Sequence, residues 1–338
     1  MKKSEKAILL SAVVMIITGG VMSLICLMMG AVWDNGGRYR ERSNTIYAPS
    51  AYAEELAPID GGIPAVEQAG EDTYIMEGAF AQGYDREWNF VGQEINSLDL
   101  SVGVGEMIVQ TGDDFRVEAN HFQDGMRCEV RNGTLYVEED EQGFWEVWNW
   151  DNQGQTPLIV VTVPDGTVFE KVKCKVGAGS MVTGEILARS AEIDVDAGVF
   201  YGDFLHAGEK LKVDVDAGSA EIYGGGCEGR LTVDVDAGGA MFSDFNASAA
   251  DFDVDAGGIT YSGTLLGDWK ADCDVGSVEL CLEAEESRYN YVVDNDMGSV
   301  SIGGQSFANL SDNAQINNQA SFTGRIDCDM GSVTVEFY

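Results

Sequence analysis

Hydrophobic and polar residues alternate along much of the second half of the chain. In residues 211–224 (LKVDVDAGSAEIYG), Leu211, Val213 and Val215 alternate with charged residues, and the alternation resumes after Ala-Gly at Ala220. A period of two indicates strands that bury one face. Beyond residue 33, no stretch of comparable length has helical periodicity. The pattern therefore predicts an all-β fold in which the chain bends at each Ala-Gly.

The bend segment recurs with a period of about 20 residues. Related segments run from KVGAGS through four DVDAG copies to CDVGSV, DNDMGSV and CDMGSV. Their motif glycines are Gly179, Gly198, Gly218, Gly238, Gly257, Gly276, Gly298 and Gly331. Such a repeat is typical of stacked coils, in which each strand pairs with its equivalent one coil on. We therefore predict a parallel β-helix of about 20-residue coils, and the related segment VGVGEMIV around Gly105 indicates an earlier coil.

An antiparallel sandwich is the alternative all-β architecture, because it also uses short strands at regular spacing. The four nearly identical DVDAG copies imply equivalent positions in the fold. Strands of a sandwich are not equivalent to one another, whereas the coils of a solenoid are. The repeat therefore favours the β-helix.

The N-terminal region has a different pattern. Residues 7–33 carry no charged side chain and exceed the ~20 residues that cross a bilayer. A cleaved signal peptide has an apolar region of only ~7 to 15 residues. We therefore predict a cytoplasmic tail at 1–6, one transmembrane helix at 7–33, a flexible stalk at 34–72 and an extracytoplasmic β-helix at 73–338. The stalk contains three of the five prolines, and the span places the protein in the cell membrane, single-pass, with its C-terminal domain outside the cytoplasm.

Charge excludes some partners and sites. The chain has 57 acidic and 20 basic residues, for a net charge of −37. Nucleic-acid binding needs a basic face, so we expect no nucleic-acid partner. Only two histidines are present, His121 and His206, which are too few for a histidine-rich zinc site.

The cysteines follow the alternation. There is no CxxC motif, and Cys26 lies in the apolar N-terminal run. Of the remaining six, Cys174, Cys273 and Cys328 occupy positions where the repeat places inward apolar side chains. Buried free cysteine behaves as a small hydrophobe. We therefore expect free core thiols rather than the three disulfides that six cysteines would permit.

Several segments together resemble a known family. They are SLDLSVGVGEMIV from Ser97, NGTLYVEE from Asn132, LIVVTVP from Leu158, and the Gly-bend repeats that follow. In this order they resemble the bacterial β-strand-repeat family named putative adhesin, over about residues 90–338. The resemblance implies a membrane-anchored or exported domain of Gram-positive bacteria with a role in adhesion.

Aligned repeats place aspartates in two outward columns. The first contains Asp194, Asp214, Asp234, Asp253, Asp272, Asp294 and Asp327, and the second contains Asp196, Asp216, Asp236, Asp255, Asp274, Asp296 and Asp329. Burying so many carboxylates would cost several kcal/mol each, so we expect them to be exposed. One hypothesis is that they bind Ca²⁺, a cation that prefers oxygen ligands, through Asp194, Asp196, Asp214, Asp216, Asp234, Asp236, Asp253 and Asp255. The alternative, which we favour, is a solvated acidic face.

The segment EEDEQGFWEVWNWDNQGQ interrupts the strand pattern before the repeats. It concentrates Phe144, Trp145, Trp148 and Trp150 among acidic and amide residues. Exposed aromatic faces with polar neighbours can bind sugar rings or another surface. The alternative is a cap over the open end of the solenoid, because terminal coils need covering. Both interpretations stay open, and we favour the cap.

These observations predict a membrane-anchored, extracytoplasmic and non-enzymatic binding module, which could act in envelope-stress signalling. Its partner would be a cell-envelope polymer or a surface protein. A self-assembling surface scaffold is the second hypothesis, because uncovered ends of a β-helix can stack. A polysaccharide-cleaving enzyme is the third and weakest, because acid-base catalysis needs two carboxylates in different environments and the repeated aspartates look alike.

Overall fold

The computed structural model describes residues 86–120, 126–139, 157–307 and 312–338. It also gives the backbone of four short strands, β1 (Val32–Trp33), β2 (Tyr39–Arg40), β3 (Val66–Gln68) and β4 (Tyr74–Met76). The chain divides into two compact units, one of Met1–Glu67 with Met76–Ala79 and one of Gln68–Ile75 with Phe80–Tyr338. The repeats belong to the second unit, and the following paragraphs concern that unit.

The predicted tail, span and stalk fall almost entirely outside the described residues. The last two residues of the predicted span form β1, which pairs antiparallel with β2. Among the described residues, no helix has the length and apolar character that a membrane crossing requires. The transmembrane helix therefore stays a prediction.

The described part of the second unit consists of strands joined by bends and turns. The N-terminal strands are β5 (Arg86–Asn89), β6 (Ser97–Val102), β7 (Glu106–Gly112), β8 (Arg116–Asn120), β9 (Met126–Arg131), β10 (Thr134–Glu139) and β11 (Leu158–Pro164). The repeat strands are β12 (Val168–Val176), β13 (Ser180–Val195), β14 (Val199–Val215), β15 (Ser219–Val235), β16 (Gly239–Val254), β17 (Gly258–Leu265), β18 (Trp269–Cys273) and β19 (Ser277–Leu282). After a 3-10 turn (Glu286–Arg288) come β20 (Tyr289–Asn295), β21 (Ser299–Ile302), β22 (Gln305–Phe307), β23 (Asp312–Ile316), β24 (Phe322–Cys328) and β25 (Ser332–Phe337).

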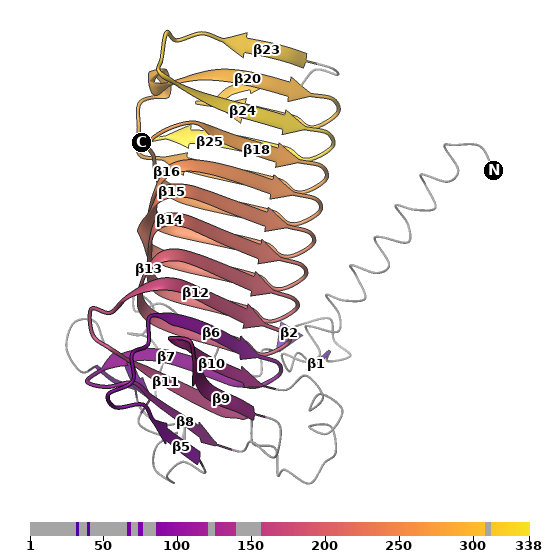
Figure 1. Ribbon diagram of the computed structural model, residues 1–338. Coiled ribbons are helices and arrows are strands. Elements are labelled where there is room, and N and C mark those ends of the chain that lie inside the picture. Colours follow the sequence, from indigo (N-terminus) through magenta and orange to yellow (C-terminus); the bar gives the residue numbers. More distant parts are fainter. Residues whose placement is uncertain are drawn as a thin grey trace. The chain divides into compact units, whose positions relative to one another are not determined.

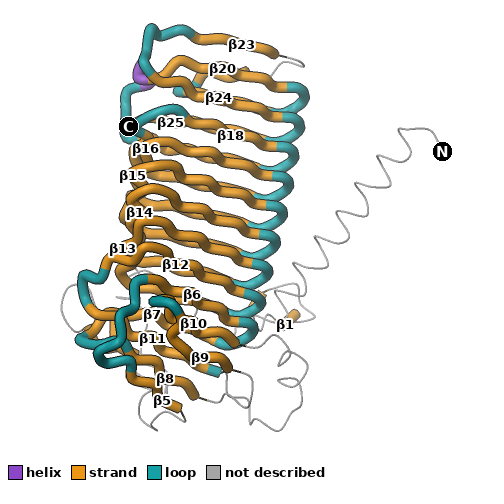
Figure 2. The backbone as a smooth tube through the Cα atoms, in the orientation of Figure 1, coloured by secondary structure: helices purple, strands orange, loops and turns teal. Residues whose placement is uncertain are grey.

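The central repeats stack in register. Each of β13 to β16 runs from one bend to the next and pairs in parallel with the strand one repeat later, so that Asp194 lies beside Asp214 and Asp214 beside Asp234. Figure 1 shows these strands as layers of one stack, and Figure 2 shows their bends in a row along one edge. Inward residues such as Val213 and Val233 are fully buried. The described part is thus all-β and solenoid-like, with the predicted alternation of buried and exposed residues.

The bend glycines are needed because neighbouring backbones approach closely. A Cβ atom on Gly218 would lie 2.2 Å from the carbonyl oxygen of Gly198, and one on Gly238 would lie 2.3 Å from that of Gly218. Neither glycine has a positive φ. The close approach accompanies hydrogen bonds between bends, such as the one from the Ser219 amide to the Gly198 oxygen at 3.0 Å. Only a residue without a Cβ fits at this position.

The stacking order departs from chain order at the N-terminal end. The coil formed by β6 and β7 lies between β10 and β11 on one side and β12 and β13 on the other. The carbonyl oxygen of Gly105 packs against Gly179, just as the carbonyl oxygen of Gly179 packs against Gly198 in the following coil. The predicted earlier coil is therefore present. Three antiparallel pairs, β5–β8, β8–β11 and β9–β10, complete this end.

The order also changes at the C-terminal end. Strands β24 and β25 lie between β18–β19 and β20–β21, so Asp327 pairs with both Asp272 and Asp294 (Figure 1). Antiparallel strands β22 and β23 pair with β21 and β20. The expectation that each coil stacks on the next in sequence is therefore wrong here. The segments around Gly276, Gly298 and Gly331 share one inward and outward pattern, so the alternation permits either order.

A carboxylate caps the first bend. The amides of Gly103, Val104 and Gly105 all donate hydrogen bonds to Oε2 of Glu139, at 2.7, 3.1 and 3.3 Å. In the next coil the corresponding amides donate to carbonyl oxygens of this bend, as Ala178 does to Gly103. Glu139 thus supplies the acceptor that another coil would supply, and unpaired buried amides are costly.

The cysteines lie where the alternation predicts. Cys174, Cys227, Cys273 and Cys328 are buried, Cys128 and Cys281 are partly buried, and all six are free thiols. Burial raises the pKa of the Cys174 thiol to about 12, which keeps it protonated near neutral pH. These four buried cysteines therefore act as small core side chains.

Candidate binding surface

The two aspartate columns are continuous along the bend edge of the solenoid. In space the first column runs Asp194, Asp214, Asp234, Asp253, Asp272, Asp327, Asp294, with each member paired in register with the next. The second column lies on the bends in the matching order Asp196, Asp216, Asp236, Asp255, Asp274, Asp329, Asp296. All fourteen are exposed or partly exposed. The structure therefore places every predicted aspartate on the surface.

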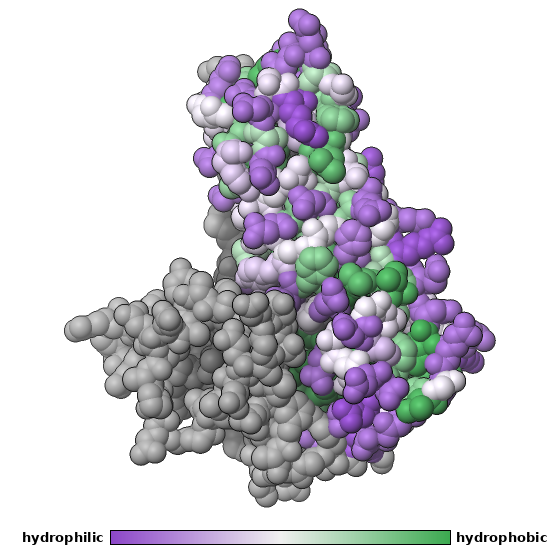
Figure 3. All heavy atoms as spheres, turned by 90° about the vertical axis from the view of Figure 1, so that its left-hand side faces the viewer, coloured by the Kyte–Doolittle hydropathy of each residue, from purple (hydrophilic) through white to green (hydrophobic). Residues whose placement is uncertain are grey.

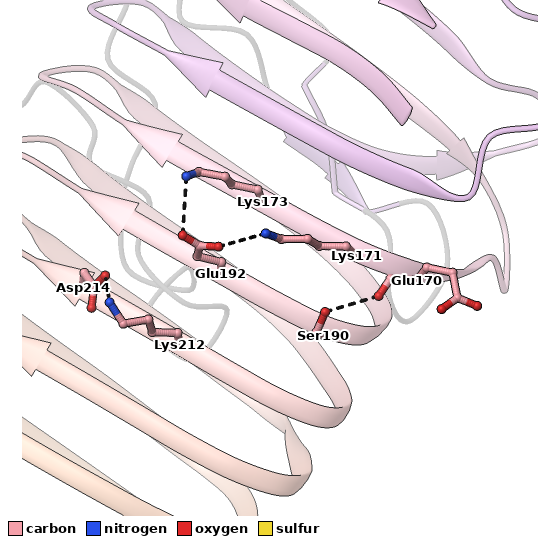
Figure 4. Close-up of polar contacts among 7 residues, drawn as sticks. All are labelled: Glu170, Lys171, Lys173, Ser190, Glu192, Lys212 and Asp214. Atoms are coloured by element: carbon pink, nitrogen blue, oxygen red, sulfur yellow. Dashed lines mark hydrogen bonds and ion pairs between the residues drawn. The ribbon is translucent and has the colours of Figure 1, made fainter. Parts of the chain in front are cut away.

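Basic side chains neutralise part of this edge. Near the N-terminal end, Lys171 and Lys173 of β12 both reach the carboxylate of Glu192 on β13, at 3.1 and 3.4 Å (Figure 4). Hydrogen bonding to Lys171 is the main reason that the pKa of Glu192 is lowered. Farther along, Lys212 pairs with Asp214 on the same strand. These pairs are partly exposed, so each contributes little to stability.

Four aspartates of the columns have raised pKa values. The pKa values of Asp194, Asp253, Asp274 and Asp327 are raised, and burial is the largest cause in each case. For Asp253 the neighbouring Asp272 and Asp234 contribute next. Partial burial and like charge both oppose ionisation. These four carboxylates therefore carry unfavourable burial and electrostatic repulsion when they are ionised at neutral pH.

This repulsion predicts an unusual dependence of stability on pH. A carboxyl group whose pKa is raised on folding binds its proton more tightly in the folded state. Its destabilising effect therefore begins to decrease as the pH falls through the raised pKa and is gone below the ordinary pKa of 3.8. We expect the Tm to rise when the pH is lowered from 7 to about 4. Glu192, with its lowered pKa, acts in the opposite direction, but only below its ordinary pKa.

Thermal unfolding followed by circular dichroism measures this effect. Substituting Asp253, Asp274 and Asp327 by Asn should reduce the rise. The control neutralises three exposed acids outside the columns, Asp165→Asn, Glu185→Gln and Glu279→Gln, and should keep it. A Tm that falls steadily from pH 7 to 4 in the unmodified chain would contradict the prediction.

The calcium hypothesis concerns eight aspartates of the same columns. Within the described ranges, no group of three or more His, Cys, Asp or Glu side chains is arranged to hold a metal ion. Ca²⁺ usually takes six to eight oxygen ligands. Binding of Ca²⁺ by the eight aspartates from Asp194 to Asp255 stays a prediction.

The predicted aromatic site lies outside the described residues. Phe144, Trp145, Trp148 and Trp150 all belong to the interval 140–156. Glu139, which immediately precedes this interval, caps the first bend. The two proposed roles of the aromatic residues, a cap over the end of the solenoid and a ligand site, both stay predictions.

One surface feature was not anticipated from the sequence. Val275, Met330 and Met297 lie at the tips of three bends, and we call them the bend ridge. They are 56, 57 and 64% exposed. The signal was present in the repeats, because these three residues replace the Ala of DVDAG. On the side of the molecule away from the bends, hydrophilic and hydrophobic residues are interspersed over the coils (Figure 3).

Comparison with known proteins gave structural likenesses only. No family model matches the chain, and no curated protein matches it. It is similar to a solved structure named "putative lipid binding protein" from Parabacteroides distasonis, with 13% identity, 75% of this chain and 98% of that chain covered, and a TM-score of 0.42.

Two further solved structures carry the name "putative adhesin". The one from Parabacteroides distasonis is 14% identical, the match covers 74% of this chain and 95% of that chain, and the TM-score is 0.40. The one from Bacteroides fragilis is 12% identical, the match covers 74% of this chain and 94% of that chain, and the TM-score is 0.38. Structures named as adhesins are thus among those to which this chain is similar.

Proposed function

We propose that this protein is a non-enzymatic binding module of the cell envelope. The observation that carries the proposal is the pair of aspartate columns, which presents equivalent carboxylates on successive coils of one solid stack. Solenoid proteins bind partners along extended surfaces. Because equivalent sites repeat along the axis, weak contacts to a repeating partner add up. The surface suits an envelope polymer or a surface protein that carries cationic groups.

The proposal has two further parts, the type of solenoid and its place in the cell. The parallel register of the central repeats supports a parallel β-helix over residues 73–338. The uncharged segment 7–33 would anchor the chain in the membrane, with the solenoid on the outer side. There the columns would face the polymers of the envelope, and a role in envelope-stress signalling is compatible with such a position.

A pull-down with isolated cell-wall material tests the proposal. The full chain should sediment with the wall fraction, and binding should weaken with added salt because exposed charges are screened. Substituting Asp234, Asp236, Asp253 and Asp255 by Asn should reduce the bound fraction severalfold. These four residues lie on two neighbouring coils and carry none of the described lysine pairs.

A matched variant separates the columns from net charge. Substituting Asp165→Asn, Glu185→Gln, Glu279→Gln and Glu283→Gln removes the same charge from exposed positions outside the columns. This variant should bind as the unmodified chain does. Equal losses in both variants, or no loss in either, would reject the columns as the binding surface. Self-assembly stays the second hypothesis, which size-exclusion chromatography tests.

A further inference from the structure

The bend ridge departs from the repeat in a way that folding does not require. The tip of the bend is alanine in five coils, at Ala178, Ala197, Ala217, Ala237 and Ala256. It is Val275, Met330 or Met297 in the three coils nearest the C-terminal end of the stack. Since alanine is sufficient for the bend, the larger side chains add apolar surface that the fold does not bury. Exposed apolar side chains that lie together are a feature of binding surfaces.

The inserted C-terminal strands bring the three side chains into one row. The Met330 amide donates to the Asp274 oxygen at 2.7 Å, and the Met297 amide donates to the Asp329 oxygen at 2.7 Å. The order along the stack is therefore Val275, Met330, Met297. Strands pair at ~4.8 Å, so the row spans about 10 Å.

Carboxylates accompany this row on one side. Asp274, Asp329 and Asp296 directly precede the three ridge residues, and all are exposed. Across the described part of the chain, no lysine, arginine or histidine forms an ion pair with these three aspartates. Serines follow on the other side, at Ser277, Ser332 and Ser299. The ridge is thus an apolar line with a negative border.

We propose that the bend ridge docks a cationic amphipathic helix of a partner protein. Residues i, i+3 or i+4, and i+7 of a helix lie about 5 and 10 Å apart along its axis, which matches the spacing of Val275, Met330 and Met297. Lysine or arginine beside that apolar stripe would face Asp274, Asp329 and Asp296. Methionine suits such a surface because its flexible side chain adapts to different partners.

The charge of the border argues against other occupants. An anionic membrane surface would be repelled by the carboxylates. A second copy of this chain, docked ridge to ridge, would bring two acidic borders together. The inference rests on the proposed binding function, and it names the chemistry of one partner.

Binding of a synthetic peptide to the full chain tests the proposal. The probe is a labelled 14-residue helix of leucine and lysine with all leucines on one face, and the measurement is fluorescence anisotropy at physiological salt. Substituting both Met297 and Met330 by Ala should weaken binding at least tenfold. Alanine occupies the same place in five other bends, so the variant should fold, which circular dichroism checks.

Two controls give the experiment its specificity. Leu266→Ala removes another exposed apolar side chain, 47% exposed and away from the bends, and should not change the affinity. A peptide of the same composition with scattered leucines should bind at least tenfold more weakly. Affinity within twofold in the double methionine variant, or equal binding of the scattered peptide, would overturn the proposal.

Binding to lipid vesicles tests the remaining alternative, that the bend ridge contacts a lipid surface. Methionine-dependent binding to phosphatidylcholine or phosphatidylglycerol vesicles, without peptide binding, would assign the ridge to lipid and overturn the helix. If wall binding depends on the aspartate columns while the peptide does not bind, only this inference fails. If the peptide binds and the wall does not, the envelope proposal fails.

Discussion

Replacing Gly218 by Ala is expected to lower the free energy of unfolding by about 3 kcal/mol, at the upper end of the usual cost of overpacking. The new Cβ would lie 2.2 Å from the Gly198 oxygen and 2.7 Å from a methyl carbon of Val195. Neither atom belongs to a flexible chain end. The backbones of two coils would therefore have to separate, which would weaken the hydrogen bonds between their bends.

Gly239→Ala is the matched control, since it adds the same methyl group directly after the motif glycine of the next coil. A Cβ there would meet only the Gly258 oxygen, at 3.7 Å, which is an ordinary contact. The expected change is at most a stabilisation of about 0.5–1 kcal/mol, because glycine in a strand is entropically costly. Urea unfolding of both variants measures the difference. Equal stabilities would show that the coils are not in the close contact described.

Cys273→Asp is expected to cost about 3–5 kcal/mol, the usual price of an uncompensated buried charge. The Cys273 side chain is 1% exposed and lies beside Cys328 of the inserted strand β24. Burial raises the pKa of its thiol to about 11, so the site disfavours any anion. A carboxylate there would either remain charged without a partner or take up a proton at the cost of stability.

The same substitution at Cys281 provides the comparison. Cys281 lies on the next strand, β19, in a partly exposed position. A carboxylate there keeps contact with water, so we expect a change near 0.5 kcal/mol, as for most surface substitutions. Cys273→Val, which keeps a small apolar side chain, should cost less than about 1.5 kcal/mol. Equal losses for Cys273→Asp and Cys281→Asp in urea unfolding would place Cys273 outside the core.

The alternation and the repeat were sufficient to predict much of the fold. Val213 faces inward and Asp214 outward because a strand with one buried face must alternate. The repeated glycine marked each bend, although its reason is close backbone approach and not a left-handed conformation. The position of the aspartates on the surface followed from the cost of burying charge.

The order of the last coils was not predictable from the alternation. One polar residue does carry information about that order. Asn295 occupies an inward position and is 1% exposed, and its Nδ2 donates to the Phe307 oxygen at 2.6 Å. Such an amide needs a polar partner, which the covering strand β22 supplies. In this chain the inward Asn295 thus marks the coil that β22 covers.

The cap at the first bend was also not predicted from the sequence. Glu139 lies on the same face of β10 as the buried Leu135 and Val137, so the alternation distinguishes it from Glu138 but does not identify its partners. Its role depends on the three amides of residues 103–105, which are more than 30 positions away. Contacts of this kind can be predicted only when the order of the strands in the stack is known.

The insertion of β24 has a consequence for how the protein is made. Asp327 pairs with Asp272 although 55 residues separate them, since 327 − 272 = 55. Ribosomes add ~5–20 residues per second, so this edge of β18 waits about 3 to 11 s for its final neighbour. A polypeptide that ends before residue 322 would lack β24, so the edge of β18 that pairs with β24 would stay unpaired. We expect quality-control proteases to recognise that open edge and to remove incomplete chains.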